Sequence, residues 1–215
     1  MYSISAETYG EGWLACTKLV LDEGASILDE EVKLIECLNI CLRIDQPQED
    51  DSIIRILADS ALVERGIKKF ESIKLLPNAY FSYAQRLYSH ADVNQIEWLV
   101  NRLRNKPETK SATISTLVAG DENAHLPCLS LVDFKIRDGR LNMTTVFRSQ
   151  DILTRHPGNS MALSRLHTNV GDRLNVVKGT HFYHIISAHI YERDLPSIGT
   201  ELREEIDKTE IHFVR

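Results

Sequence analysis

The chain has 215 residues, and its 25 Lys and Arg against 31 Asp and Glu give a formal net charge of -6. A hydrophobic content of 43% and a mean hydropathy of -0.22 are typical of a folded protein with a substantial core, and they exclude intrinsically disordered and fibrous classes. The acidic surplus also argues against polymeric nucleic acid as a partner, because such binding needs Lys and Arg to neutralise phosphates. The length predicts a single domain over residues 1–215.

The sequence carries no sign of export or membrane insertion. No apolar run approaches the roughly 20 residues that span a bilayer, and the N-terminal segment MYSISAETYGEGW lacks the pattern of a secretory signal. We therefore expect a cytoplasmic protein with reduced cysteines and no membrane partner. The cysteines lack the paired spacing of zinc ligands, so we predict no metal site and interpret each as a buried side chain or a reactive thiol. They are Cys16, Cys37, Cys41 and Cys128.

In the first half of the chain, the spacing of apolar residues predicts helices and one long strand. Three and four residue spacing predicts helices over residues 9–22, 53–67 and 93–103. Two helices broken near Gly66 fit the second of these segments equally well. A strand is predicted over residues 33–44 because four apolar residues alternate there. These residues are Leu38, Ile40, Leu42 and Ile44.

In the second half, the apolar period changes to two. Alternation predicts strands over residues 129–136 and 141–147, joined by a hairpin turn at Asp138-Gly139. Two antiparallel strands are therefore expected here.

A long helix and a final strand are predicted next. Asn159 or Ser160 is a suitable N-cap for the helix, and Gly179 is expected just past its end. Residues 180–191 alternate as a strand requires. Together with the first half, this order of elements predicts the α+β class.

Three short motifs in the second half carry side chains suited to chemistry. They place a thiol at the start of a strand, an arginine and a carboxylate after the end of a strand, and a histidine and tyrosine on one strand face. Taken singly, each motif is typical of ordinary packing or turns. The motifs are Pro127-Cys128, Arg148-Ser149-x-Asp151 and His189-x-Tyr191.

Together with Asn159 between them, these motifs resemble the thymidylate synthase family, which includes the pyrimidine hydroxymethylases. The resemblance runs from Leu126 to Tyr191, and the segments TYGEGW and ECLNICLRIDQP are similar to short, archaeal-type members. It implies an α+β fold with a large mixed β-sheet flanked by helices. It also implies a homodimer in which the two sheets stack across the interface.

The resemblance assigns the nucleophile and the phosphate ligands. Cys128 would add as a thiolate to C6 of a pyrimidine nucleotide, which makes C5 nucleophilic enough to accept a one-carbon unit. Arg148 would hold the phosphate with help from Ser149 and would favour the thiolate by its charge. Lys110 stands where the family has one of two arginines that reach across the dimer to the partner's phosphate.

The resemblance also assigns the base, sugar and cofactor contacts. Asn159 would read the O4 and N3-H edge of uracil, where the cytosine-specific relatives carry an aspartate. His189 and Tyr191 would bind a ribose hydroxyl. Asp151 would contact the pterin of 5,10-methylenetetrahydrofolate or a related methylene pterin.

The sequence departs from the family pattern at two places that matter for chemistry. Gly66 stands where the family has its catalytic glutamate, and Glu64 or Glu71 replaces it only in a shifted register. Ser111, next to Lys110, stands where the second of the two arginines is expected. The predicted phosphate site therefore has fewer basic residues than the family pattern.

The reaction implied is methylation of a uridylate such as dUMP or UMP, and two alternatives stay open. The family's tryptophan that shields the one-carbon intermediate from water is absent between Tyr80 and Tyr88, and Trp98 belongs to a different predicted helix. This keeps a hydroxymethylase as an alternative. A non-catalytic nucleotide-binding member is the other, and the retained Cys128 argues against it because a binder needs no nucleophile. We therefore expect a methyltransferase.

Overall fold

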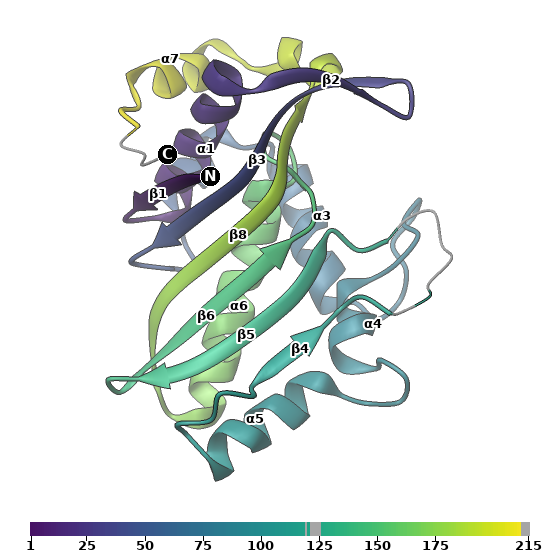
Figure 1. Cartoon of the computed structure of the whole chain (residues 1–215), viewed down its shortest axis with the longest axis vertical. Helices are drawn as coiled ribbons and strands as arrows, with labels where there is room; N and C mark the ends of the chain where they lie inside the picture. Colours follow the sequence, from purple (N-terminus) through teal and green to yellow (C-terminus); the bar gives the residue numbers. More distant parts are fainter. Residues whose placement is uncertain (119, 121–125, 212–215) are drawn as a thin grey trace.

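The computed structural model describes residues 1–118, 120 and 126–211. Its strands are β1 (Tyr2–Ala6), β2 (Ala25–Asp29), β3 (Val32–Ile44), β4 (Thr113–Ser115), β5 (Leu129–Arg137), β6 (Arg140–Phe147), β7 (Gln150–Asp151) and β8 (Val177–Tyr191). They form one eight-stranded sheet in the order β1-β3-β8-β6-β5-β4, with β2 added to β3 and β7 to β8 (Figure 1). The sheet is mixed, because β8 is antiparallel to β3 but parallel to β6 and β7.

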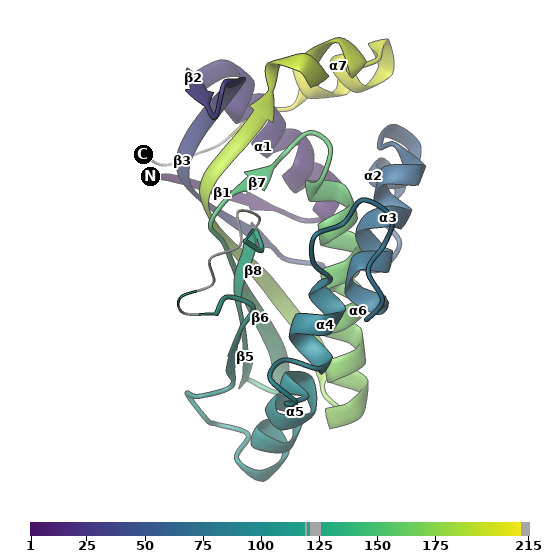
Figure 2. The same cartoon turned by 90° about the vertical axis from the view of Figure 1, so that its right-hand side faces the viewer.

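The helices are α1 (Tyr9–Glu23), α2 (Ser52–Leu57), α3 (Ser60–Glu71), α4 (Tyr83–Tyr88), α5 (Gln95–Asn105), α6 (His156–Leu174), the 3-10 helix η1 (Glu192–Ser197) and α7 (Thr200–Lys208). Figure 2 shows α2 to α6 on one side of the sheet, with α6 against the sheet and α3 outside it. The predicted α+β class and the mixed sheet flanked by helices are confirmed. Over the part of the chain that the structure describes, none of these helices is long and apolar enough to cross a membrane.

Helix α6 begins and ends at other residues than the sequence predicts. It starts at His156, with Arg155 as the N-cap and a proline in its first turn, where the missing N–H of proline costs no hydrogen bond. Asn159, predicted as a cap, therefore lies inside the helix. The helix ends at Leu174, its C-cap Asn175 has a left-handed φ of 55°, and Gly179 is already part of β8.

Helices α2 and α3 are separate, and the break lies before the predicted position. Asp59 caps α3 by accepting hydrogen bonds from the backbone N–H groups of Ala61 and Leu62. Gly66, near which the break was expected, is an interior residue of α3. Similarly, α5 starts at Gln95 behind the cap residue Asn94, two residues after the predicted start.

The middle of β3 interrupts the predicted alternation. Asn39 has a left-handed φ of 59°, which reverses the direction of the neighbouring side chains. Ile40 is fully buried as predicted, but Leu38 is 54% exposed. The prediction that these two side chains share one face was therefore wrong. The alternation predicted for β6 is confirmed, since Leu141 and Phe147 at its two ends are buried.

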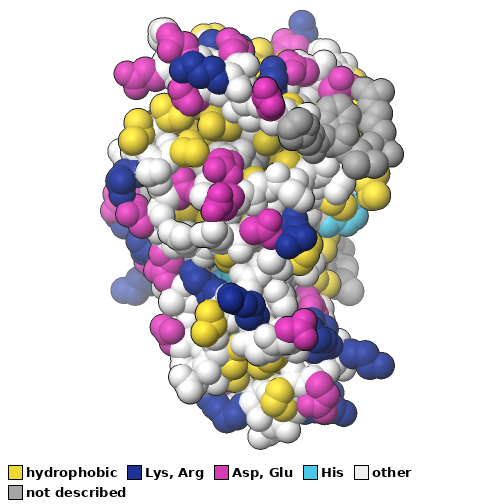
Figure 3. Space-filling model, turned by 90° about the vertical axis from the view of Figure 1, so that its left-hand side faces the viewer, with side chains coloured by type: hydrophobic (Ala, Val, Ile, Leu, Met, Phe, Trp, Pro, Cys, Tyr) yellow, Lys and Arg dark blue, Asp and Glu magenta, His cyan; other side chains and the backbone are white. Residues whose placement is uncertain are grey.

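No helix formed by the described residues covers one face of the sheet. In Figure 2 the labelled helices lie away from this face, and three large apolar side chains, Leu38, Phe182 and Ile186, are 40 to 54% exposed on β3 and β8. By contrast, acidic, basic and apolar side chains are interspersed on the flank shown in Figure 3. The apolar residues on the sheet are therefore candidates for contact with another protein surface.

Candidate active site

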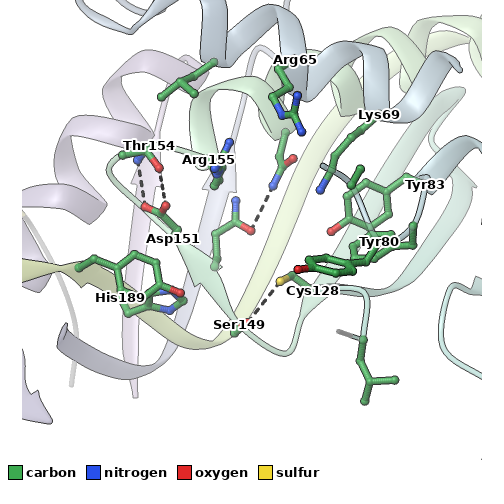
Figure 4. Close-up of a pocket in the computed structure, with 18 of the residues that line it drawn as sticks. Arg65, Lys69, Tyr80, Tyr83, Cys128, Ser149, Asp151, Thr154, Arg155 and His189 are labelled. Carbon is green, nitrogen blue, oxygen red and sulfur yellow. Dashed lines mark hydrogen bonds between the residues drawn. The ribbon is translucent and has the colours of Figure 1, made fainter. Parts of the chain in front are cut away.

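A cavity of about 620 Å³ lies between α3, the start of β5, the segment after β6 and the end of β8 (Figure 4). Seven of the eight site residues expected from the sequence line it. These are Cys128, Arg148, Ser149, Asp151, Asn159, His189 and Tyr191. Lys110 does not line this cavity and lies exposed in the segment between α5 and β4.

The thiol lies where β5 and β6 bring two of the motifs together. Cys128 directly precedes β5 and is partly exposed, and the Ser149 hydroxyl donates a hydrogen bond to its Sγ at 3.4 Å. The backbone N–H of Arg148 donates to the Cys128 carbonyl at 2.9 Å. Antiparallel pairing of β5 with β6 therefore places the Pro-Cys and Arg-Ser motifs side by side, although they are distant in the sequence.

The Arg148 guanidinium is tied to the backbone that precedes the thiol. Its Nε donates to the carbonyl of Pro127 at 3.1 Å, and its NH2 donates to the carbonyl of Leu126 at 2.8 Å. A guanidinium has five N–H donors in a rigid planar group. The donors that remain can bind an anion while the first two hold the arginine beside Cys128.

Positive charge dominates the described part of the cavity lining. Among the described residues, five cationic side chains line the cavity, against two carboxylates, Asp151 and Asp194, which leaves a formal excess of three positive charges there. The chain as a whole has a net charge of -6, so this excess is local. A concentration of positive charge in a cleft favours an anionic ligand such as a phosphate. The cations are Arg65, Lys69, Arg148, Arg155 and Arg193.

One of these cations, Lys69 of α3, lies against two aromatic rings of the cavity. Its Nζ lies 4.8 Å from the ring centroid of Phe81 and 5.8 Å from that of Tyr83. The pKa of Lys69 is lowered. Burial is the main cause, and neighbouring arginines add to it, whereas the charge of Cys128 acts in the opposite direction. Figure 4 shows Arg65 and Lys69 projecting from α3 across the cavity from Cys128 and Ser149.

The structure does not favour a glutamate in place of Gly66. A Cβ at Gly66 would lie 2.8 Å from the Cα of Gly158, so a side chain there requires the two helices to move apart. Glu64 and Glu71, the two alternatives, form ion pairs with Lys68 and Arg165 and do not line the cavity.

At the other end of the cavity, β7 and β8 bring a carboxylate and two rings together. Asp151 pairs in register with His189 and accepts hydrogen bonds from the backbone N–H and the hydroxyl of Thr154. Burial lowers the pKa of His189, while the charge of Asp151 raises it. The rings of His189 and Tyr191 are 5.0 Å apart and nearly perpendicular, and burial raises the pKa of the Tyr191 hydroxyl.

Several cavity residues were not found by sequence reasoning. Arg65 and Lys69 are four residues apart on an amphipathic helix, so they share a face, but nothing in the sequence shows that this face meets Cys128. Gln150 is the unassigned residue of the Arg-Ser-x-Asp motif and accepts a hydrogen bond from the Asn159 amide at 3.3 Å. Arg155 is the N-cap of α6 and lies outside every motif assigned from the sequence.

The fold and the cavity together define a class of protein. It is an α+β protein with a mixed sheet, in which a cysteine thiol faces a cavity of excess positive charge.

Comparison with known proteins gives the family. The family model described as "Thymidylate synthase" matches residues 66–213. A relative from Methanocaldococcus jannaschii is 36% identical over 83% of this chain and 86% of its own length. Relatives from Methanococcoides burtonii and Methanothermobacter marburgensis are both 32% identical, over 91% and 89% of this chain and 92% and 93% of their own lengths. All three carry the name "Putative thymidylate synthase". The chain belongs to the thymidylate synthase family.

Proposed function

We propose that this protein transfers a one-carbon unit to C5 of a uridylate, dUMP or UMP, through a covalent bond between Cys128 and C6 of the base. The observation that carries the proposal is the thiol of Cys128 at a cation-lined cavity that also holds the Asn159 amide. A binding protein has no need of a nucleophile at this position. The proposed active unit is a single thymidylate synthase-like domain over residues 1–215.

The chemistry begins with the thiolate. C5 of uracil is a poor nucleophile, so Cys128 first adds its sulfur electron pair to C6, and the ring electrons move onto C5 and O4. C5 then forms a bond to the one-carbon unit, whose bond to the nitrogen of its donor would break, and C5 loses its proton. Addition of a hydride or of water to the new carbon would then be accompanied by breakage of the bond from sulfur to C6, which regenerates the thiolate. The surrounding cations, Lys69 and Arg148 among them, offset the negative charge that moves from sulfur to O4.

The nucleotide contacts follow from the charges and donors of the cavity. We assign the phosphate to Arg148 and Ser149, with further positive charge from α3 and from η1. Asn159 offers both a donor and an acceptor to the base edge. His189 and Tyr191 are assigned to the sugar. Lys110 is proposed to act at the phosphate of a partner subunit, because it lies outside its own cavity.

The residues present suit a folate cofactor. Tyr80 and Phe81 offer aromatic faces to a flat pterin, and Asp151 offers a carboxylate to its N–H groups. When bound, 5,10-methylenetetrahydrofolate supplies the one-carbon unit and, for a methyl product, the hydride. A cavity volume of about 620 Å³ is within the usual range for small-molecule sites.

Hydroxymethylation is the second candidate, and one observation favours it. Among the described cavity residues there is no tryptophan, since the Trp13 indole donates to the Ile152 carbonyl in the core and Trp98 is on α5. A site without a large apolar shield admits water more easily to the one-carbon intermediate. The product therefore has to be identified by mass.

We further propose a homodimer that stacks the uncovered sheet faces. Leu38, Phe182 and Ile186 leave apolar surface exposed on this face, and burying it against a second copy stabilises both subunits. In this dimer Lys110 is proposed to act at the phosphate of the partner subunit, the role that the family resemblance assigns to it.

Turnover tests the proposed function. The purified protein is incubated with 5,10-methylenetetrahydrofolate and dUMP or UMP that carries tritium at C5, and tritium release into water is measured beside the product mass. We expect release by the wild type and by Cys41→Ala, whose thiol is also partly exposed but lies outside the cavity, and none by Cys128→Ala. A product heavier by a hydroxymethyl group would select the second candidate, and no release with either nucleotide would refute the proposal.

A further inference from the structure

Asn159, the residue assigned to the base, stands at the end of a buried chain of hydrogen bonds. Its Nδ2 donates to Oε1 of Gln150 at 3.3 Å, and the Gln150 Nε2 is 3.3 Å from Nδ1 of His156. The other ring nitrogen of His156, Nε2, is 3.4 Å from the Ser160 hydroxyl, which also accepts a hydrogen bond from Tyr183 at 3.0 Å. Gln150, His156 and Ser160 are at most 1% exposed.

This chain of hydrogen bonds has a direction. Burial lowers the pKa of His156 to about 4, so the ring is neutral at neutral pH and has one donor and one acceptor nitrogen. The Gln150 Nε2 faces Nδ1, and because an amide nitrogen only donates, Nδ1 accepts and the ring proton lies on Nε2, which donates to Ser160. The Gln150 oxygen then faces Asn159 and requires an N–H from it.

The direction matters because the Asn159 amide can rotate by about 180°, which exchanges its oxygen and its nitrogen. With one N–H of Asn159 held by Gln150, its Oδ1 and its second N–H form the pair that remains for a ligand. If Gln150 presented its N–H instead, Asn159 would turn over and exchange the places of donor and acceptor. Uracil offers an acceptor at position 4 and a donor at N3, whereas cytosine offers the reverse order. A fixed amide therefore matches only one of the two bases when the ring is held in place.

We propose that Gln150 and His156 set the base selectivity of the site by fixing the orientation of the Asn159 amide, so that a 4-keto pyrimidine is accepted and a 4-amino pyrimidine is rejected. This inference rests on the proposed function, because it assumes that the cavity binds a pyrimidine nucleotide. Gln150 and His156 are positioning residues, since they act through Asn159.

The test compares the dissociation constants of dUMP and dCMP, measured by calorimetry at pH 7.5, in two variants of Gln150. In Gln150→Met the side chain has a similar length but no polar group, so Asn159 is free to turn over. We expect the preference for dUMP to fall by about tenfold or more, through tighter dCMP binding relative to dUMP. Gln150→Glu keeps an oxygen acceptor toward Asn159, and the preference should stay within about threefold of the wild type.

Two further variants separate positioning from general damage. Thr17→Val removes another buried hydroxyl, which donates to the Trp13 carbonyl at 2.8 Å within α1, and should leave the preference unchanged. His156→Leu frees Gln150 without altering it and should reproduce the loss of preference, which covers the case that Gln150→Met does not fold. Circular dichroism melting identifies the variants that fold.

The outcomes distinguish the inference from the function on which it rests. Wild-type protein that binds neither these deoxyribonucleotides nor UMP and CMP would overturn the proposed function. Wild-type protein that prefers dUMP, with an equal preference in Gln150→Met and His156→Leu, would overturn the inference and leave the proposed function standing. A preference lost in both variants and retained in Gln150→Glu is the result that we expect.

Discussion

The backbones of Gly66 in α3 and Gly158 in α6 are in direct contact, such that a Cβ at Gly66 would lie 2.8 Å from the Cα of Gly158. This contact holds α3 close to α6 at the residue that precedes Asn159. It also explains how Arg65 and Lys69, on either side of Gly66 along the helix, reach the cavity that contains Cys128. A residue that departs from the family pattern thus has a clear structural role.

Replacing Gly66 by alanine should destabilise the protein. Alanine has the higher helix propensity, but its methyl group would press on backbone atoms of Gly158, which cannot rotate away as a side chain does. We expect Gly66→Ala to lower the free energy of unfolding in urea by about 1–3 kcal/mol. Gly199→Ala is the control, because no atom lies within 4 Å of a Cβ there, and it should cost less than about 1 kcal/mol. Equal effects of the two substitutions would contradict the packing argument.

Replacing Lys69 should weaken nucleotide binding, whereas replacing its neighbour Lys68 should not. Lys69 lines the cavity, but Lys68 pairs with Glu64 at 2.6 Å outside it. We expect Lys69→Met to raise the dissociation constant of dUMP about tenfold, in keeping with the loss of a charge-assisted contact. Lys68→Met should leave it within about twofold. If both variants bind dUMP as the wild type does, Lys69 has no part in binding.

The sequence predicted those parts of the molecule that depend on local pattern. The hairpin at Asp138-Gly139 and the strands on either side follow from alternation and from a turn residue that tolerates positive φ. Leu38 could not be placed correctly, because the left-handed Asn39 reverses the pattern and such a conformation leaves no clear signal in an apolar alternation. The start of α6 was placed at Asn159 or Ser160, which are capping residue types, whereas the helix begins before Pro157, a residue that is favoured in a first turn.

The residues of the candidate site also fall into those that local motifs predict and those that only the packing of helices brings into place. Residues in compact motifs, such as Cys128 and Asp151, were found from their spacing and from the family resemblance. Arg65 and Lys69 were missed because only the packing of α3 on α6 brings them opposite the thiol. Gln150 was missed because its role depends on His156 and Asn159, which meet it through the first turns of α6.

Stability should fall as the pH is lowered from neutral to acid. Burial lowers the pKa of both His156 and His167 from the ordinary value of 6.5 to about 4. Because the unfolded chain binds these protons more readily, the stability is complete above about pH 6.5 and is lost as the pH falls toward 4.

Urea unfolding at pH 7 and pH 5.5 measures this loss. Between pH 7 and pH 5.5, we expect each buried histidine to lower the free energy of unfolding by about 1 kcal/mol. The His156→Leu variant should show a smaller loss than the wild type, because it has one such group fewer. A free energy of unfolding that does not change between the two pH values would be inconsistent with neutral, buried histidines.

The homodimer can be tested by placing a charge on the uncovered sheet face. Ile186 is 41% exposed there, and we expect Ile186→Asp to shift the protein from dimer to monomer in light scattering at micromolar concentration, because an unpaired carboxylate would be buried. Val177, at the start of the same strand, is 68% exposed. Val177→Asp should leave the dimer intact. A wild-type protein that is monomeric would rule out the stacked arrangement.

The central claim is that the Cys128 thiolate adds to C6 of the base, and trapping that adduct tests it most directly. In 5-fluoro-dUMP the fluorine at C5 cannot leave as a proton does, so the enzyme, cofactor and nucleotide should remain joined after the one-carbon unit is bound. Intact-protein mass spectrometry after incubation with 5-fluoro-dUMP and 5,10-methylenetetrahydrofolate should show this adduct in the wild type and in Cys41→Ala, and not in Cys128→Ala. Absence of the adduct in the wild type, with fluorinated uridine and cytidine nucleotides alike, would contradict a catalytic role for Cys128.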